Sequence, residues 1–133
     1  MCGIIGINSN KEVSSIILNS LRKLEYRGYD SAGIATLNSG YIQEVKCEGR
    51  VDNLEKNIFK NKLLGTIGIG HVRWATHGKP SKINAHPHSS DQVSVVHNGI
   101  IENSTILKKF LEKKGYLFTV SYTHLTLPTN REV

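Results

Sequence analysis

The sequence predicts one domain of mixed helices and strands, of the α/β or α+β class. An apolar run at residues 2–7 ends in a polar turn, which is typical of a buried strand. Residues 11–24 then place apolar side chains at helical spacing. Two strand-like runs, 32–37 and 41–48, flank Asn38-Ser39-Gly40, and such a short glycine-containing connector predicts a β-hairpin.

The middle of the chain extends this alternation. The polar residues 8–10 offer N-cap candidates for the first helix, and residues 51–59 predict a second, shorter helix. Residues 64–72 form an apolar stretch with three glycines, which indicates a strand that another backbone or a ligand approaches closely. A long polar loop follows over residues 73–91.

The last predicted elements are a buried strand over residues 92–96 and a helix over residues 104–114. The triplet His97-Asn98-Gly99 between them is typical of a turn. Asn103 stands at the N-cap position of the helix and Gly115 directly after its end, as capping preferences predict. The length of 133 residues fits a single domain.

The composition is that of an ordinary soluble globular protein, with 38% hydrophobic and 21% charged residues. The formal net charge of +6 is spread over several segments without the interleaved aromatic residues of a nucleic-acid surface. No apolar run approaches the roughly 20 residues that span a bilayer. We therefore expect neither a nucleic acid nor a membrane as a partner.

Cys2 and Cys47 are the two cysteines of the chain. The first residues lack the basic region, long apolar run and cleavage site of a secretory signal, so we expect a cytoplasmic protein with both thiols free. Cys47 lies in a predicted strand and is expected to be a core residue. A buried, inert thiol is also the simplest interpretation of Cys2 considered alone.

Position 2 nevertheless gives Cys2 a route to reactivity that Cys47 lacks. Removal of Met1 before a small residue leaves a thiol and a free α-amine on the same residue. An α-amine has a pKa of about 7.7 to 8.0, near enough to neutral to accept the thiol proton directly or through one water. A thiol activated by its own amine is an effective nucleophile.

Five histidines fall within a short span: His71, His77, His86, His88 and His97. Their spacing fits neither the pattern His-Glu-x-x-His nor any paired Cys/His pattern, and Cys47 has no near partner. The sequence therefore predicts no metal site, and it indicates no cofactor.

Five segments, in order along the chain, resemble the class II (N-terminal-nucleophile) glutamine amidotransferases. They are residues 2–6, 24–33, 71–78, 84–88 and 95–103. The similarity runs from Met1 to about Thr119. Two of the segments favour the branch of the family whose acceptor is a sugar phosphate.

The resemblance implies catalytic roles for four residues. Cys2 would attack the side-chain amide of glutamine and form a glutamyl thioester. The Asn98 side-chain amide and the Gly99 backbone N–H would stabilise the oxyanion of the tetrahedral intermediate, although an Asn-Gly pair considered alone favours a simple turn. Arg27 would steady the nucleophile end of the site.

The resemblance also assigns residues to the substrate. Arg73 would bind the glutamine α-carboxylate through its guanidinium fork. Thr76 and His77 would complete the pocket and help it close, and His86 belongs to the same substrate-binding set. Trp74 would gate the passage of ammonia in the complete enzyme.

The fold implied by the resemblance is α+β, a partial four-layer αββα sandwich of the N-terminal-nucleophile hydrolase type. The implied function is glutamine hydrolysis that supplies ammonia to fructose 6-phosphate, giving glucosamine 6-phosphate, in an enzyme expected to be a homo-oligomer. The isomerase domains that would bind fructose 6-phosphate are missing from this chain. The alternatives are another acceptor within the same class, or a catalytically inactive fragment.

Residues 1–119 are expected to be the first part of the glutaminase domain, and residues 120–133 a tail that does not match it. In the family an aspartate beyond this point binds the α-ammonium of glutamine, and this chain has no aspartate after Asp91. A charged partner of that kind contributes roughly 1.5 to 3 kcal/mol. Because a chain cut inside a sheet exposes apolar faces and unpaired edges, we expect low stability.

Overall fold

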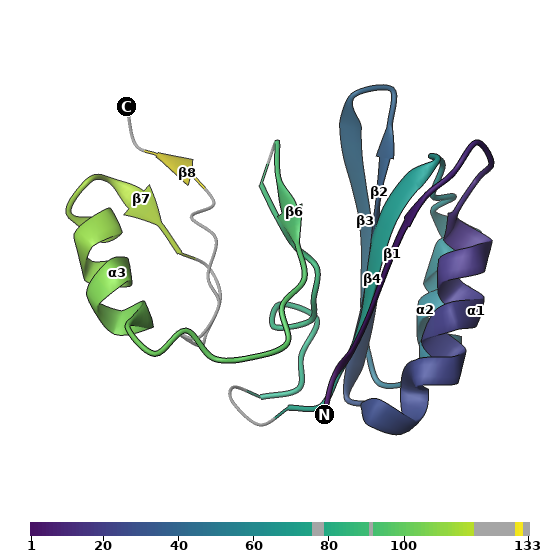
Figure 1. Cartoon of the computed structure of the whole chain (residues 1–133), viewed down its shortest axis with the longest axis horizontal. Coiled ribbons are helices and arrows are strands. Elements are labelled where there is room, and N and C mark those ends of the chain that lie inside the picture. The colour runs from purple at the N-terminus through teal and green to yellow at the C-terminus, as the bar shows by residue number, and fades with distance from the viewer. Residues whose placement is uncertain (76–78, 91, 119–129, 132–133) are drawn as a thin grey trace.

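The structure, a computed structural model, describes residues 1–75, 79–90, 92–118 and 130–131. Figure 1 shows four layers: two helices, a four-stranded sheet, a short strand pair, and a third helix beside another strand pair. In chain order the elements are β1 (Gly3–Asn8), α1 (Ser14–Leu24), the 3-10 helix η1 (Glu25–Arg27), β2 (Ser31–Asn38), β3 (Tyr41–Glu48), α2 (Val51–Lys60), β4 (Ile67–Arg73), β5 (His88–Ser89), β6 (Ser94–Val95), α3 (Ser104–Glu112), β7 (Tyr116–Leu117) and β8 (Asn130–Arg131). The α+β prediction and its αββα layering are confirmed.

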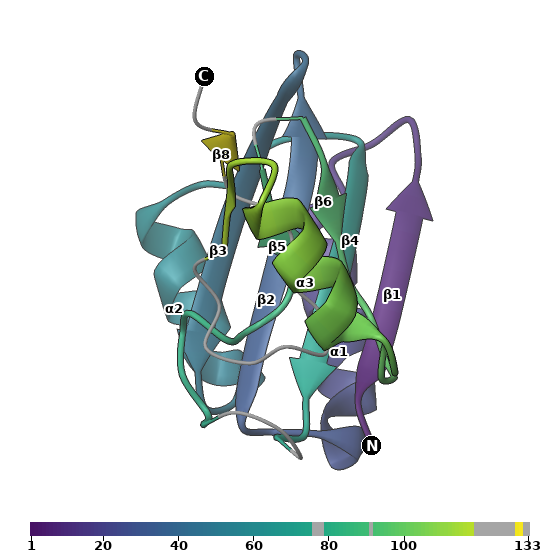
Figure 2. The same cartoon turned by 90° about the vertical axis from the view of Figure 1, so that its left-hand side faces the viewer.

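The main sheet is antiparallel and has the strand order β1-β4-β2-β3. The central strand β4 pairs with β1, where Gly3 lies opposite Val72, and with β2, where Ser31 lies opposite Arg73. This register brings the first residues of the chain, the loop before β2 and the end of β4 to one end of the sheet. That end is the one at which the N-terminus lies in Figure 2.

The hydrophobic core lies between this sheet and the helices α1 and α2. Alternate residues of each strand face the helices, so Ile34 of β2 and Val72 of β4 are buried in one cluster with Ile17 of α1. Gly68 and Gly70 face the same way, and a Cβ at either position would lie within 2.6 Å of an Ile17 side-chain atom. The close approach predicted for this strand is therefore made by helix α1.

The opposite face of the sheet is covered in part by residues 79–90. A Cβ on Gly33 would overlap the carbonyl oxygen of His86, so a glycine lets this segment lie directly on β2. Lys46 of β3 donates from Nζ to the Pro87 carbonyl at 3.2 Å. The β5 and β6 pair continues this layer across the sheet (Figure 2).

The predicted hairpin is confirmed. β2 and β3 pair along their whole length, and the connecting residues Ser39 and Gly40 have φ values of 50° and 82°. Positive φ at both positions is what a type I′ two-residue hairpin turn requires. The second helix also lies where it was predicted, at Val51–Lys60.

Two predictions for the first elements were wrong. The first strand is not buried: β1 is an edge strand with one neighbour, and Ile4 stays 40% exposed. Helix α1 begins at Ser14 rather than residue 11, and no side chain caps it. The cause is a contact with the segment that precedes β4, because the Glu12 carboxylate accepts the N–H of Gly65 at 2.7 Å.

The predicted strand over 92–96 is only partly buried and shortens to Ser94–Val95, since it pairs with the two-residue β5 alone. Helix α3 ends at Glu112, earlier than predicted, and Asn103 forms no side-chain cap bond although it holds the cap position. Gly115 follows the helix with a φ of 82°, as a C-terminal glycine cap requires.

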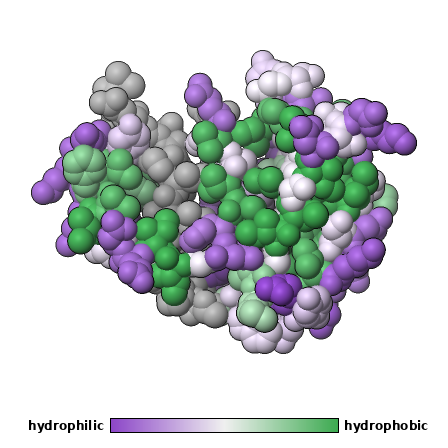
Figure 3. Space-filling model, viewed as in Figure 1, coloured by the Kyte–Doolittle hydropathy of each residue, from purple (hydrophilic) through white to green (hydrophobic). Residues whose placement is uncertain are grey.

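The outer layer exposes apolar side chains. Ile106, Leu107 and Phe110, which form the apolar stripe of α3, are all exposed. Figure 3 shows apolar surface over this helix and again over the sheet. Beside α3, residues 130–131 of the predicted tail pair with β7. Within the part of the chain that the structure describes, no helix has the length and apolar character needed to cross a membrane.

Candidate active site at the N-terminal end of the sheet

Cys2 directly precedes β1, and the pairing of Gly3 with Val72 sets it beside the end of β4. The Trp74 backbone N–H donates to Cys2 Sγ at 3.3 Å, and the Cys2 thiol lies 3.8 Å from the Trp74 carbonyl oxygen. The cysteine is half-buried. The sulfur is therefore held against the backbone of Trp74, the residue after Arg73. The cysteine stays partly accessible to solvent.

The loop between α1 and β2 holds Cys2 from the other side. Arg27 donates from Nε to the Cys2 carbonyl oxygen at 3.0 Å, which anchors the backbone of the candidate nucleophile. Gly28 lies against the end of β4, where a Cβ would be 2.5 Å from the Arg73 carbonyl carbon and 2.7 Å from the Trp74 nitrogen. The loop can close this tightly because residue 28 has no side chain.

Asp30 orients the backbone on both sides of Trp74. Its Oδ2 accepts the Ala75 N–H at 2.7 Å, and its backbone N–H donates to the Arg73 carbonyl at 3.1 Å. The Trp74 N–H is thereby held toward the Cys2 sulfur. Gly28 and Asp30 were not predicted as site residues, because a glycine and an acid in a loop carry no signal until the facing strand is known.

Arg73 ends β4 with a buried side chain, 4% exposed. Its Nη1 donates to the Lys79 carbonyl at 3.2 Å, and Asn84 donates from Nδ2 to the same oxygen at 3.0 Å. These bonds bring the beginning and the middle of the polar loop together. The predicted substrate residues Thr76 and His77 lie outside the described residues.

The Trp74 side chain packs against a second aromatic residue. Its ring is 44% exposed and meets the edge of Tyr29 with 5.8 Å between the ring centroids. The Arg50 guanidinium lies 5.1 Å from the Tyr29 centroid on a ring face, a cation–π contact that restrains the tyrosine.

Asn98 and Gly99 follow β6 and are exposed. Asn98 Oδ1 lies 2.8 Å from Nε2 of His71 on β4, and the His97 backbone N–H donates to His86 Nδ1 at 3.3 Å. Gly99 has a φ of 154°, a conformation that side chains disfavour. The predicted turn is therefore attached to the sheet layer through two histidines.

His71, His86 and His88 form a row of buried imidazoles, called here the histidine row. The rings of His71 and His86 stack at 4.3 Å, and those of His86 and His88 lie 4.4 Å apart. Burial lowers the pKa of His71 and of His88 to about 4 and that of His86 to about 2, and neighbouring positive charges add to the effect. The row, which includes the predicted substrate residue His86, is neutral at pH 7.

This row predicts a loss of stability in mild acid. The unfolded chain protonates its histidines near pH 6.5, whereas folded His71 and His88 stay neutral to about pH 4. Since the unfolded state then binds more protons, the free energy of unfolding falls between pH 6.5 and 4, by up to about 1.4 kcal/mol per pH unit for each histidine. Urea unfolding at pH 7, 6 and 5 measures the slope, and His88→Phe should flatten it; equal slopes for both chains would contradict the expectation.

Cys47, unlike the half-buried Cys2, is withdrawn from solvent. It is buried in the core at 4% exposure, which confirms the sequence prediction, and burial raises its pKa to about 11. Among the described residues, no three histidine, cysteine or acidic side chains gather as metal ligands would.

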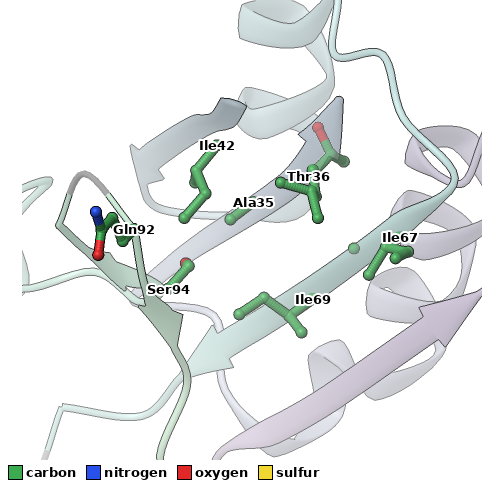
Figure 4. A pocket seen from close by; sticks show the side chains of 9 residues that line it. Ala35, Thr36, Ile42, Ile67, Ile69, Gln92 and Ser94 are labelled. Atoms are coloured by element: carbon green, nitrogen blue, oxygen red, sulfur yellow. The ribbon is translucent and has the colours of Figure 1, made fainter. Parts of the chain in front are cut away.

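An apolar groove of about 180 Å³ lies at the other end of the sheet (Figure 4). Ala35, Ile42 and Ile69 line it from β2, β3 and β4, and Ser94 of β6 closes one side. The groove also touches Ile67, which begins β4, whereas the candidate nucleophile lies beyond the end of that strand. We therefore place the candidate active site at Cys2.

Solved structures with the same fold define the class. The chain is similar to the glutamine phosphoribosylpyrophosphate amidotransferase of B. subtilis, with a TM-score of 0.78 and 29% identity over 93% of this chain and 27% of that one. A second structure, described as the allosteric regulatory enzyme of purine biosynthesis, gives a TM-score of 0.79 and 31% identity over 91% and 27% of the two chains. With Cys2 at the end of the sheet, the chain belongs to the N-terminal-nucleophile glutamine amidotransferases.

Within this class, the sequence is similar to glutamine–fructose-6-phosphate aminotransferase (isomerizing). The identity is 59% over 120 residues with the enzyme of Clostridium acetobutylicum, 54% over 118 with that of Bradyrhizobium diazoefficiens, and 50% over 119 with that of Haemophilus influenzae. These matches take in 89% of the chain but only 19 to 20% of each relative, in its N-terminal region. The chain thus spans about a fifth of the length of these curated relatives. No family model matches it.

Proposed function

We propose that this chain is the first part of the glutaminase domain of an enzyme that converts fructose 6-phosphate to glucosamine 6-phosphate. Residues 1–119 would belong to that domain, and the cytoplasm, where thiols stay reduced, would be its compartment. The observation that carries the proposal is the setting of Cys2: a half-buried cysteine whose sulfur accepts the Trp74 N–H and whose carbonyl oxygen accepts a hydrogen bond from Arg27.

The chemistry begins with removal of Met1, which is exposed. This removal leaves an α-amine on Cys2. The amine takes the thiol proton, and the sulfur attacks the side-chain amide carbon of glutamine. The electron pair of the C=O bond moves to oxygen, and Asn98 and the Gly99 N–H donate to that oxyanion. The α-ammonium returns the proton to the amide nitrogen, so the C–N bond breaks, ammonia leaves and the thioester forms; water then attacks the thioester, which releases glutamate and restores the thiol.

The remaining site residues would bind glutamine and retain ammonia. Arg73 would hold the α-carboxylate, and its burial beside the Lys79 carbonyl supports a fixed guanidinium rather than a freely moving surface charge. Thr76, His77 and His86 would complete the substrate pocket. Trp74, beside the sulfur, would gate the exit of ammonia.

The choice of acceptor rests on degree of similarity. The aminotransferases that use fructose 6-phosphate are 50 to 59% identical, whereas the phosphoribosylpyrophosphate amidotransferase is 29% identical over a similar share of the chain. Fructose 6-phosphate itself would bind in parts of the enzyme outside this chain. Assembly of the complete enzyme into a homo-oligomer is part of the same proposal.

Covalent labelling tests whether the glutamine pocket forms. A diazoketone analogue of glutamine should alkylate Cys2 and leave Cys47 unmodified, because the Cys47 thiol is buried with a pKa of about 11. Peptide mass spectrometry locates the label, and excess glutamine should slow its appearance. Labelling that glutamine does not slow would mean that the pocket is absent and would favour an inactive fragment.

A further inference from the structure

His71 is buried and contacts the proposed oxyanion residue Asn98, but the proposed chemistry gives it no role. It lies on the central strand β4, paired on both sides, with Ile4 and Gly33 as its register partners. Its side chain is 0% exposed and stacks on His86 with an interplanar angle of 18°. A stacked ring on a strand that is paired on both sides is a rigid support.

Asn98, by contrast, is exposed on a segment between β6 and α3 that has no regular structure of its own. Its carboxamide oxygen faces His71 Nε2 at 2.8 Å. Because a carboxamide oxygen only accepts hydrogen bonds, Nε2 must be the donor and must carry the proton of a neutral ring. His97, the residue before Asn98, is held as well, since its backbone N–H donates to His86 Nδ1.

We propose that His71 is a positioning residue that holds the Asn98 carboxamide by its oxygen, so that the amide N–H₂ group is the end presented to the glutamine oxyanion. This inference rests on the proposed function of Asn98. A carboxamide free to rotate would offer its oxygen as often as its nitrogen, and an oxygen there would repel the developing charge. An oxyanion donor is effective when it is oriented before the charge appears.

The kinetic test is a double-mutant cycle in the full chain, with Cys2-dependent glutamate release as the readout. His71→Phe keeps a stacked ring and removes the donor, and it should lower kcat about tenfold with KM within about twofold. In the Asn98→Ala background the same change should alter kcat by less than about twofold, because nothing remains to be oriented. His71→Gln, whose amide can donate, should recover part of the loss.

His88→Phe is the matched control, because it removes an imidazole from the same row at a position whose ring is tilted against that of His86, 4.4 Å away. It should leave kcat within about twofold. Equal kcat losses from His71→Phe in the wild-type and Asn98→Ala backgrounds would overturn the proposal. So would a loss of the same size from His88→Phe.

A measurement of the ring proton decides the geometry even in a chain without glutaminase activity. Long-range ¹H–¹⁵N NMR of the chain at pH 7 should show His71 protonated at Nε2, with a proton shift that moves upfield in Asn98→Ala. A His71 protonated at Nδ1 would overturn the inference while leaving the proposed function intact. If NMR finds the expected Nε2 proton but no glutamate is released, the result would instead count against the proposed function.

Discussion

Replacing Cys2 with alanine is expected to lower glutamate release from glutamine to the uncatalysed level, a fall of at least about a thousandfold. Without the sulfur no thioester can form, and the oxyanion donors have no tetrahedral intermediate to stabilise. The other thiol cannot substitute for it, because Cys47 lies in the core behind the sheet. An enzyme-coupled assay for glutamate measures the rate directly.

The matched control is Cys47→Ala. It should keep at least about half of the glutaminase rate while lowering the free energy of unfolding by roughly 1 to 2 kcal/mol through the small cavity it leaves. Equal rates in the two variants would show that the measured glutamate does not arise at Cys2. The intact mass of each preparation must be recorded with the rate, since a retained Met1 would block the α-amine that serves as the base.

Gly28→Ala is expected to lower the glutaminase rate on the order of a hundredfold. The new Cβ would overlap the Arg73 carbonyl carbon and the Trp74 nitrogen, both part of fixed backbone, so the loop or the end of β4 must move. That movement displaces the N–H that faces the Cys2 sulfur, and a shift of about 1 Å in a catalytic group can cost about a hundredfold in rate. Overpacking should also cost about 1 to 3 kcal/mol of stability.

Gly6→Ala controls for the cost of a methyl group in the same sheet. Among the described residues its Cβ would meet nothing nearer than an Ile69 side-chain carbon at 3.9 Å, an ordinary contact. Both rate and urea midpoint should stay near the wild-type values. If Gly28→Ala matched Gly6→Ala in rate and in midpoint, the Arg27–Gly28 loop would not be setting the position of Cys2.

The elements predicted most accurately from the sequence were those with local signals. The hairpin around Ser39-Gly40 and the helix beginning at Val51 form where turn chemistry and helical spacing placed them. The start of α1 could not be found this way, because residues 9–13 bond to residues 65 and 66, more than fifty positions away. The edge position of β1 likewise depends on the strand order, which no local pattern specifies.

The residues of the candidate site likewise fall into those that the sequence could identify and those that it could not. Cys2 was identifiable because its position in the chain is itself chemical information, and Arg27, Arg73 and Asn98 followed from the family resemblance. His71 and Asp30 were not identified, because each acts on a backbone or side chain that only the fold brings near. A histidine in a glycine-rich strand has no distinguishing mark until Asn98 is seen beside it.

The pairing of Gly3 with Val72 joins the two ends of a stretch of about 70 residues. During translation, at roughly 5 to 20 residues per second, Met1 emerges several seconds before the strand that completes the site has been made. The N-terminus is therefore open to processing while its partners do not yet exist. The candidate nucleophile Cys2 lacks the backbone that holds its sulfur until β4 and Trp74 have been made.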